Sequence, residues 1–315
     1  METTLSKPKS VEYKMDLTTH LSINGSAVPT LGFGTYKLEN VEESIENAIK
    51  MGYRLFDTAK FYDNEEAIGK SINKCISLGL VKRSELFIST KLWMDDLHDP
   101  EQALKQALKR LNLEYIDIYF YHWPLPSCEN GEIKQMFPLH ETWKKLEACV
   151  DKNLTRALGV SNFNVQLILD LLSYCQIKPA MLQVELHPVL AQPKLRQFCE
   201  KFGLKIMAYN PILRGASAQN HADYEKFNLF NNFVVTEIAK KYKISATQAI
   251  LNWHLKNKVV PIPKSSTYSH QLENFESLLF EMEEEDYAKI DGLNADKRFN
   301  FSEEKPFSAG IEVFI

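Results

Sequence analysis

The chain has 315 residues, of which 44% are hydrophobic and 25% are charged. A chain of this length and composition can bury a large apolar core without disulfides or metals, which excludes disorder as its main state. Its 37 Lys and Arg against 41 Asp and Glu give a formal net charge of −4, which excludes the basic surface of a typical nucleic-acid-binding protein.

The cysteines and the N-terminus indicate where the protein works. The five cysteines are widely spaced and form no CxxC pair, which predicts neither a disulfide framework nor a zinc site. We interpret them as small core residues in a reducing compartment. Residues 1–14 lack the apolar region of a signal peptide, and no segment reaches the ~18 apolar residues of a membrane span. We therefore expect a cytoplasmic protein with a disordered tail at 1–15 and a single domain over 16–315.

The first structured element is a predicted β-hairpin. Asn24-Gly25 lies between two short polar and apolar runs within residues 17–29. Asn-Gly between such runs is a strong hairpin signal, because both residues tolerate the positive φ of a type I′ turn.

Segments with helical periodicity then follow. Apolar residues at helical spacing predict helices around 41–51, 68–75, 99–111 and 193–202. Asp99 is a capping residue, and Pro100 suits the first helical position. Gly52 and Gly203 are placed to end two of the other helices.

Short apolar runs between these segments predict buried strands. They lie at 31–35, 54–57, 86–90, 116–121, 157–161, 181–184, 205–209 and 258–262. Alternating strands and helices predict an α/β fold with parallel βαβ units, and eight strands are the number that closes a (β/α)8 TIM barrel. An open doubly wound sheet is the alternative, but the run from Gly32 to Tyr36 lacks the third glycine of the dinucleotide fingerprint GxGxxG.

Polar residues at or near the ends of seven of these strands predict an active site. They are Asp57, Lys91, His122, Ser161, Asn162, Gln183, Tyr209 and Lys264. In a (β/α)8 barrel these positions meet at the C-terminal end of the strands, where this fold builds its active sites. Each residue alone is also compatible with capping, packing or solvation, so the prediction rests on the set.

Three of the residues could together form a proton donor. A buried Lys91 beside Tyr62 would stabilise the phenolate and lower the pKa of the tyrosine, while Asp57 keeps the ammonium charged. His122 can hydrogen-bond the same substrate oxygen. No histidine or carboxylate pair has the spacing of metal ligands, so we expect no metal site.

The remaining rim residues suit a nicotinamide cofactor. Ser161, Asn162 and Gln183 can bind a carboxamide, and Tyr209 can stack on the ring.

The sequence resembles the aldo-keto reductases, and its pattern is similar to the aldose and xylose reductase-like members. Residues 52–59 with Tyr62, Asn64-Glu65 and Gly69 resemble the first signature of the family. Residues 158–163 resemble the central one and residues 262–265 the third. The motifs occur in family order, and the resemblance extends from about residue 17 to residue 300.

The resemblance implies an NADPH-dependent reductase of aldehydes, aldoses and some ketones, with Tyr62 as the general acid. The implied catalytic tetrad is Asp57, Tyr62, Lys91 and His122. The implied cofactor-binding residues are Thr35, Tyr36, Asp57, Ser161, Asn162, Gln183, Tyr209, Asn210, Leu213, Arg214, Lys264, Ser265, Thr267, His270, Glu273 and Asn274. The implied substrate-binding residues are Tyr36, Trp93, His122, Trp123 and Asn300.

Two departures from the family pattern bear on cofactor choice. His270 stands where relatives carry an arginine against the 2′-phosphate of NADP, and losing that charge-assisted contact costs about 1.5–3 kcal/mol. We expect a weakened preference for NADPH that strengthens at low pH, where His270 is protonated. Asn210 begins a segment in which relatives have Ser-Pro-Leu-Gly, so we expect altered cofactor clamping.

Two further features bear on the substrate class. Trp93 and Trp123 follow tetrad residues and would give an aromatic cleft, although plain core packing also explains two tryptophans. Residues 297–300 resemble the C-terminal segment of xylose reductases, which points to small aldehydes and aldoses. The alternatives are a ketosteroid or prostaglandin-type reductase, a non-catalytic cofactor-binding accessory protein, and a phosphate-binding barrel isomerase. We expect a monomer with a small carbonyl substrate and no nucleic-acid or membrane partner.

Overall fold

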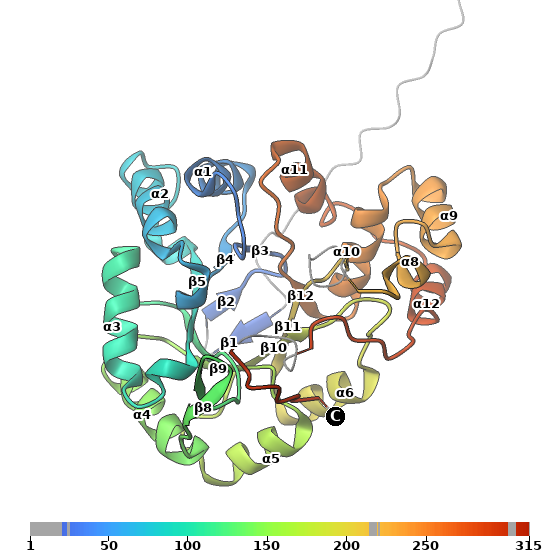
Figure 1. Cartoon of the computed structure of the whole chain (residues 1–315). Coiled ribbons are helices and arrows are strands. Elements are labelled where there is room, and N and C mark those ends of the chain that lie inside the picture. The colour runs from blue at the N-terminus through green and yellow to red at the C-terminus, as the bar shows by residue number, and fades with distance from the viewer. Residues whose placement is uncertain (1–20, 24–25, 214–218, 220, 302–306, 315) are drawn as a thin grey trace, which may run out of the picture.

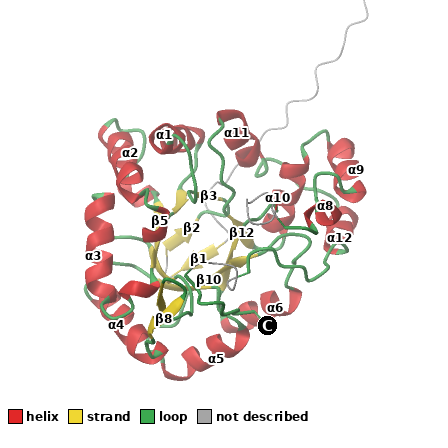
Figure 2. Cartoon of the chain, viewed as in Figure 1, coloured by secondary structure: helices red, strands yellow, loops and turns green. Residues whose placement is uncertain are grey.

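The computed structural model describes residues 21–23, 26–213, 219, 221–301 and 307–314. The tail expected at 1–15 and Arg214 lie outside the described residues. Along the barrel axis, a central ring of strands is enclosed by an outer ring of helices (Figure 1, Figure 2). None of the helices within these ranges is long and apolar enough to cross a membrane.

Eight parallel strands form the central sheet, which confirms the predicted fold class. In chain order they are β3 (Gly32–Gly34), β4 (Leu55–Asp57), β5 (Phe87–Leu92), β6 (Ile118–Tyr121), β9 (Leu158–Ser161), β10 (Met181–Glu185), β11 (Lys205–Tyr209) and β12 (Val259–Pro261). Each strand pairs with the next of this series. Gly34 N–H donates to the carbonyl of Pro263 at 3.1 Å, which joins the first strand to the segment after the last one and nearly closes the barrel.

The predicted hairpin covers one end of the barrel. Strands β1 (Leu21–Ile23) and β2 (Ser26–Val28) pair antiparallel, with Leu21 opposite Val28. Ile23 and Val28 are buried against the apolar side chains inside the barrel, which include Leu55, Phe87 and Met207. The hairpin therefore seals the interior with apolar contacts.

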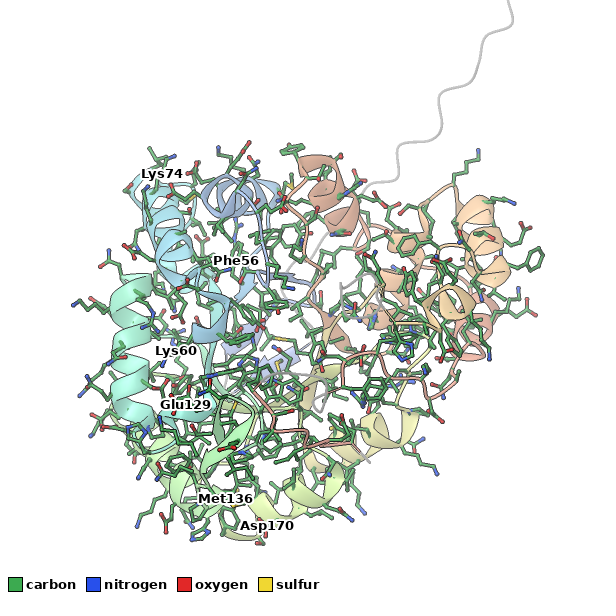
Figure 3. The ribbon with its side chains drawn as sticks, in the orientation of Figure 1. Phe56, Lys60, Lys74, Glu129, Met136 and Asp170 are labelled. Atoms are coloured by element: carbon green, nitrogen blue, oxygen red, sulfur yellow. The ribbon has the colours of Figure 1, made fainter. Side chains whose placement is uncertain are left out.

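The helices lie on the outside of the sheet. They are α1 (Val41–Met51), α2 (Glu65–Ser77), α3 (Pro100–Leu111), α4 (Leu139–Asp151), α5 (Val165–Tyr174), α6 (Pro193–Phe202), α8 (Tyr224–Phe227), α9 (Phe233–Tyr242), α10 (Ala246–Lys256), α11 (Tyr268–Glu276) and α12 (Glu284–Asp291). Short 3-10 helices lie at η1 (Lys60–Tyr62), η2 (Arg83–Glu85) and η3 (Met94–Asp96). Phe56 of β4 lies inside this ring, whereas Lys74 of α2 and Asp170 of α5 lie on its outer edge (Figure 3).

The local capping signals act as expected. The Asp99 carboxylate accepts the backbone N–H of Gln102, and Pro100 occupies the first turn of α3. Gly52 and Gly203 end α1 and α6 with positive φ.

Two further features shape the surface. The segment 125–137 contains an antiparallel pair, β7 (Ser127–Glu129) and β8 (Glu132–Gln135). In the acidic run 281–286, Asp286 is 1% exposed and binds Lys241 and Lys289. One expectation needs correction. Cys128 and Cys175 are half-buried, so only the other three cysteines are core residues.

Candidate active site

The four predicted catalytic residues come from three neighbouring strand ends and one short helix. Asp57 ends β4, Lys91 lies next to the last residue of β5, and His122 directly follows β6. Tyr62 ends η1, which follows β4. Since parallel strands end at the same edge of the barrel, this topology brings the four side chains together.

Lys91 is the centre of this arrangement. Its side chain is fully buried, and its Nζ lies 2.6 Å from Asp57 Oδ2 and 3.1 Å from Tyr62 Oη. A third hydrogen bond, of 2.8 Å, goes to the carbonyl of Thr58. The ammonium therefore joins the carboxylate to the phenol.

The second oxygen of Asp57 is held by two donors. Ser89 Oγ donates to Oδ1 at 2.7 Å, and Gln183 Nε2 donates to the same atom at 2.8 Å. Asp57 is 1% exposed, so its orientation is fixed by buried hydrogen bonds.

Burial shifts the pKa values of Tyr62, Lys91 and His122 toward their neutral forms. It raises the pKa of Tyr62, and the Asp57 carboxylate raises it further. It lowers the pKa of His122, and the Lys91 charge adds to this effect. Burial also lowers the pKa of Lys91 itself, although Asp57 opposes the shift. The expected lowering of the Tyr62 pKa is thus wrong for this structure, because desolvation outweighs the neighbouring ammonium.

His122 faces Tyr62 without a close ring contact. The two ring centroids are 6.0 Å apart, and the buried Nδ1 of His122 has no hydrogen-bond partner among the described residues. A neutral imidazole in this position can orient a polar ligand, and it is not a strong proton source.

Three residues predicted to hold the nicotinamide lie in one hydrogen-bond network. Asn162 Nδ2 donates to Ser161 Oγ at 3.1 Å and to the carbonyl of His122 at 3.0 Å. Tyr209 Oη donates to Asn162 Oδ1 at 2.9 Å. Asn162 has a φ of 61°, a left-handed conformation that asparagine tolerates better than most residues. These amide and hydroxyl groups are of the kind that binds a carboxamide.

The residues predicted near the adenosine end lie just before α11 and on this helix. Lys264 and His270 are exposed, Ser265 and Asn274 are buried, and Ser265 Oγ accepts the backbone N–H of Thr267 at 3.1 Å. Glu273 is half-buried on the same helix. An exposed lysine beside a helix N-terminus suits a phosphate group.

The other predicted cofactor residues lie on two further strand ends. Thr35 is buried after β3, and its Oγ1 donates to the carbonyl of Asp57 at 2.8 Å, while Tyr36 is 45% exposed. Asn210 and Leu213 follow β11 with positive φ, and Leu213 is buried.

Aromatic side chains surround the tetrad, including two that sequence reasoning missed. Trp93 and Trp123 are buried, and Trp93 lies 5.1 Å from His122 between ring centroids. Phe61 stacks on Trp93 at 4.2 Å, and Phe307 contacts Trp93 edge-on at 4.9 Å. Phe61 could have been predicted near the site because it precedes Tyr62 in the sequence. Phe307 lies far along the chain from the tetrad, and no sequence pattern indicated its position.

Asn300 lies next to Tyr209. Its Nδ2 donates to Tyr209 Oη at 2.9 Å. The predicted substrate residue is therefore tied to the predicted ring-stacking residue.

The arrangement can protonate an oxygen held between a phenol and a neutral imidazole. The phenol keeps its proton at neutral pH, and Lys91 can stabilise the phenolate that forms when the proton leaves.

Comparison with known proteins agrees with this geometry. A model described as "Aldo/keto reductase family" matches residues 24–295. The chain is 37% identical to aldose reductase C of Dictyostelium discoideum over 296 residues, which cover 87% of this chain and 89% of that protein. It is 37% identical to the NADPH-dependent D-xylose reductase of Candida boidinii over 88% of this chain and 93% of that protein. It is 40% identical to aldo-keto reductase family 1 member A1 of Sus scrofa over 87% and 89% of the two chains.

Proposed function

Because this chain belongs to the aldo/keto reductase family and is an oxidoreductase acting with NAD(P)H, we propose that it reduces aldehydes and aldoses to alcohols with NADPH and that Tyr62 is the general acid. The assignment of Tyr62 rests on the position of Lys91 Nζ, which lies 3.1 Å from Tyr62 Oη and 2.6 Å from Asp57 Oδ2. The relatives named as aldose and xylose reductases support the substrate class.

The residues present fit the dinucleotide. Asn162, Ser161 and Gln183 offer amide and hydroxyl groups for a carboxamide, Tyr209 offers a ring face, and Lys264 offers a cation beside the N-terminus of α11. When bound, the reduced nicotinamide supplies a hydride for the carbonyl carbon.

Proton transfer is then the task of the chain itself. Tyr62 Oη donates its proton to the carbonyl oxygen, and the O–H bond of the phenol breaks as that of the alcohol forms. The Lys91 ammonium stabilises the resulting phenolate, and Asp57 keeps this ammonium oriented. His122, as a neutral imidazole, holds the carbonyl oxygen in line with Tyr62. Asn300 and Trp123 contact the remainder of the substrate.

Removal of the phenolic oxygen tests this function. We expect Tyr62→Phe to lower turnover of glyceraldehyde and xylose by about 10²–10⁴-fold, the usual contribution of a general acid. Cofactor oxidation at 340 nm measures turnover, and quenching of protein fluorescence measures NADPH affinity, which should change little. Turnover that survives in Tyr62→Phe would remove Tyr62 from the mechanism.

The same experiment separates the alternatives. NADPH binding by the wild type without turnover of any aldehyde would favour the accessory-protein function. Turnover of ketosteroids in preference to small aldehydes would favour a large-substrate reductase.

The choice between NADPH and NADH depends on His270 in this proposal. His270 is exposed on α11, and an imidazole makes a weaker contact with a 2′-phosphate than a guanidinium does. We expect His270→Arg to tighten NADPH binding about tenfold and to leave NADH binding unchanged.

Titration of both cofactors against the wild type and the His270→Arg variant checks the role of the histidine. An NADPH affinity that is unchanged in His270→Arg, or an equal change for NADH, would contradict the role of His270.

A further inference from the structure

Glu185 is a buried carboxylate that the proposed mechanism does not use. It is the last residue of β10, and its exposed fraction is 0%. A carboxylate in such a place is costly unless its oxygens are hydrogen-bonded and its charge is matched.

The partners of Glu185 come from segments far apart in the sequence. Its Oε2 accepts the backbone N–H groups of Phe299 and Asn300, at 3.2 and 3.0 Å. Its Oε1 accepts Asn210 Nδ2 at 3.1 Å. One side chain therefore ties the end of β10 to the loop after β11 and to the C-terminal segment, which Figure 1 shows running back across the strands.

Two basic side chains lie near this carboxylate, and Arg298 supplies the opposite charge. Arg298 NH1 lies 3.7 Å from Oε2, and His187 Nε2 lies 3.5 Å from Oε1. Because His187 Nδ1 accepts the backbone N–H of Leu190, a neutral ring carries its proton on Nε2, toward the carboxylate. Burial raises the pKa of Glu185, but these contacts outweigh it and hold the pKa below its ordinary value.

A continuous series of hydrogen bonds leads from Glu185 to the tetrad. Glu185 holds the backbone of Asn300, and Asn300 Nδ2 donates to Tyr209 Oη at 2.9 Å. Tyr209 Oη in turn donates to Asn162, which donates to the carbonyl of His122. The orientation of the Tyr209 ring thus depends on where Glu185 holds Asn300.

We propose that Glu185 is a positioning residue that fixes the C-terminal segment 298–300 against Tyr209 and so sets the cofactor-facing side of the site. The proposal rests on the proposed function, in which Tyr209 stacks on the nicotinamide and Asn300 contacts the substrate. Glu185 does not touch the reacting atoms and acts through Asn300.

Asp117 provides a matched control for loss of a buried carboxylate. It is 3% exposed, accepts the backbone N–H of Ile88 at 2.9 Å and binds Arg83 at 2.8 Å. It precedes β6, at the opposite end of the barrel from the tetrad. Asp117→Asn should therefore lower thermal stability without an effect on the site.

The test compares Glu185→Gln, Glu185→Ala and Asp117→Asn. We expect Glu185→Ala to lower kcat/KM for an aldehyde about 10–100-fold, as for other displaced positioning groups, and to weaken NADPH binding. Glu185→Gln should reduce kcat/KM and NADPH affinity less than Glu185→Ala does, because one side-chain oxygen remains to accept the two backbone amides. Asp117→Asn should lower Tm about as much as the Glu185 variants do. Its kcat/KM and NADPH affinity should stay within about twofold of the wild type, because Asp117 contacts no site residue.

A double substitution tests whether Glu185 acts through Asn300. If it does, Glu185→Ala combined with Asn300→Ala should be about as active as Asn300→Ala alone, so the two effects should not add. Hydrogen exchange of a peptide covering 297–301 gives a readout without turnover, and its protection should fall in Glu185→Ala but not in Asp117→Asn.

The outcomes separate this proposal from the proposed function. An inactive wild type would refute the function, and the exchange and NADPH-binding measurements would still decide the role of Glu185. Additive effects of the two substitutions, or unchanged exchange and NADPH binding in Glu185→Ala, would overturn the proposal.

Discussion

At the scale of single residues, burial has the same chemical consequence for Tyr62 and His122. It raises the pKa of the phenol and lowers the pKa of the imidazole, so both groups are neutral over a wide pH range. A neutral phenol can give a proton, whereas a neutral imidazole can only orient a ligand or share a hydrogen bond. The geometry therefore separates an acid from an orienting group without a charged histidine.

These shifts predict different pH profiles for the two directions of the reaction. Reduction needs protonated Tyr62, which prevails below its raised pKa, so kcat/KM for an aldehyde should be flat from pH 6 to 8. Alcohol oxidation needs the phenolate, whose fraction rises about tenfold per pH unit below that pKa. We expect log kcat/KM for oxidation to rise with a slope of about one over this range.

Initial rates in both directions, with the cofactor saturating, check this prediction. Tyr62→Phe serves as the control, because it should abolish the slope of the oxidation profile. A reduction profile that falls with a midpoint between pH 6 and 8 would mean that a group titrates there, contrary to the shifts of Tyr62 and His122.

The sequence predicts residue positions better than residue environments. The positions of Asp57, Lys91 and His122 were predictable because each lies at the end of an apolar run, and such runs can be recognised in the sequence. The pKa of Tyr62 was not predictable, because desolvation depends on packing from several elements. Glu185 also ends a strand, but its partners at 298–300 lie more than a hundred residues away.

At the scale of elements, α2 and α3 approach each other closely at Gly69. A Cβ built on Gly69 would lie 2.2 Å from the carbonyl oxygen of Leu111, which is backbone and cannot turn away. Asn73 of α2 also donates to this carbonyl at 3.3 Å. The absence of a side chain at Gly69 thus sets the distance between the two helices.

We therefore expect Gly69→Ala to destabilise the fold although alanine favours helices. The added methyl must push α2 from α3, a kind of overpacking that costs about 1–3 kcal/mol. Urea denaturation measures the change in the free energy of unfolding. Gly292→Ala is the control, because Gly292 has a helical φ of −64° and a Cβ there would lie 3.3 Å from the nearest atom, the carbonyl oxygen of Lys289. Gly69→Ala with wild-type stability would show that the helices separate without cost.

Helix ends were predictable where one residue determines them. Asp99, Pro100, Gly52 and Gly203 act through their own backbone or a neighbouring N–H, so their effect is local. The burial of Asp286 was not predictable in this way, because it depends on Lys241 of α9, which lies 45 residues away in the chain.

At the scale of the whole molecule, the number of strands and the barrel fold were predictable, but the contacts that close the barrel were not. Each strand is a separate apolar run, so eight could be counted along the chain. Closure requires β3 to meet the segment after β12, and about 230 residues separate Gly34 from Pro263. Gly34 permits this approach, because a Cβ there would lie 2.6 Å from the carbonyl oxygen of Ile262.

The contact of Gly34 with residues 262–263 leads to a prediction for both stability and cofactor binding. Gly34→Ala should push β3 away from β12, lengthen the Gly34 N–H to Pro263 hydrogen bond and cost about 1–3 kcal/mol of stability. Lys264 follows Pro263 directly, so the same displacement should weaken NADPH binding. Thermal unfolding and NADPH titration measure the two effects, with Gly292→Ala again as control. A loss of stability with unchanged NADPH affinity would mean that the position of Lys264 is fixed by α11 and not by the contact between β3 and the segment after β12.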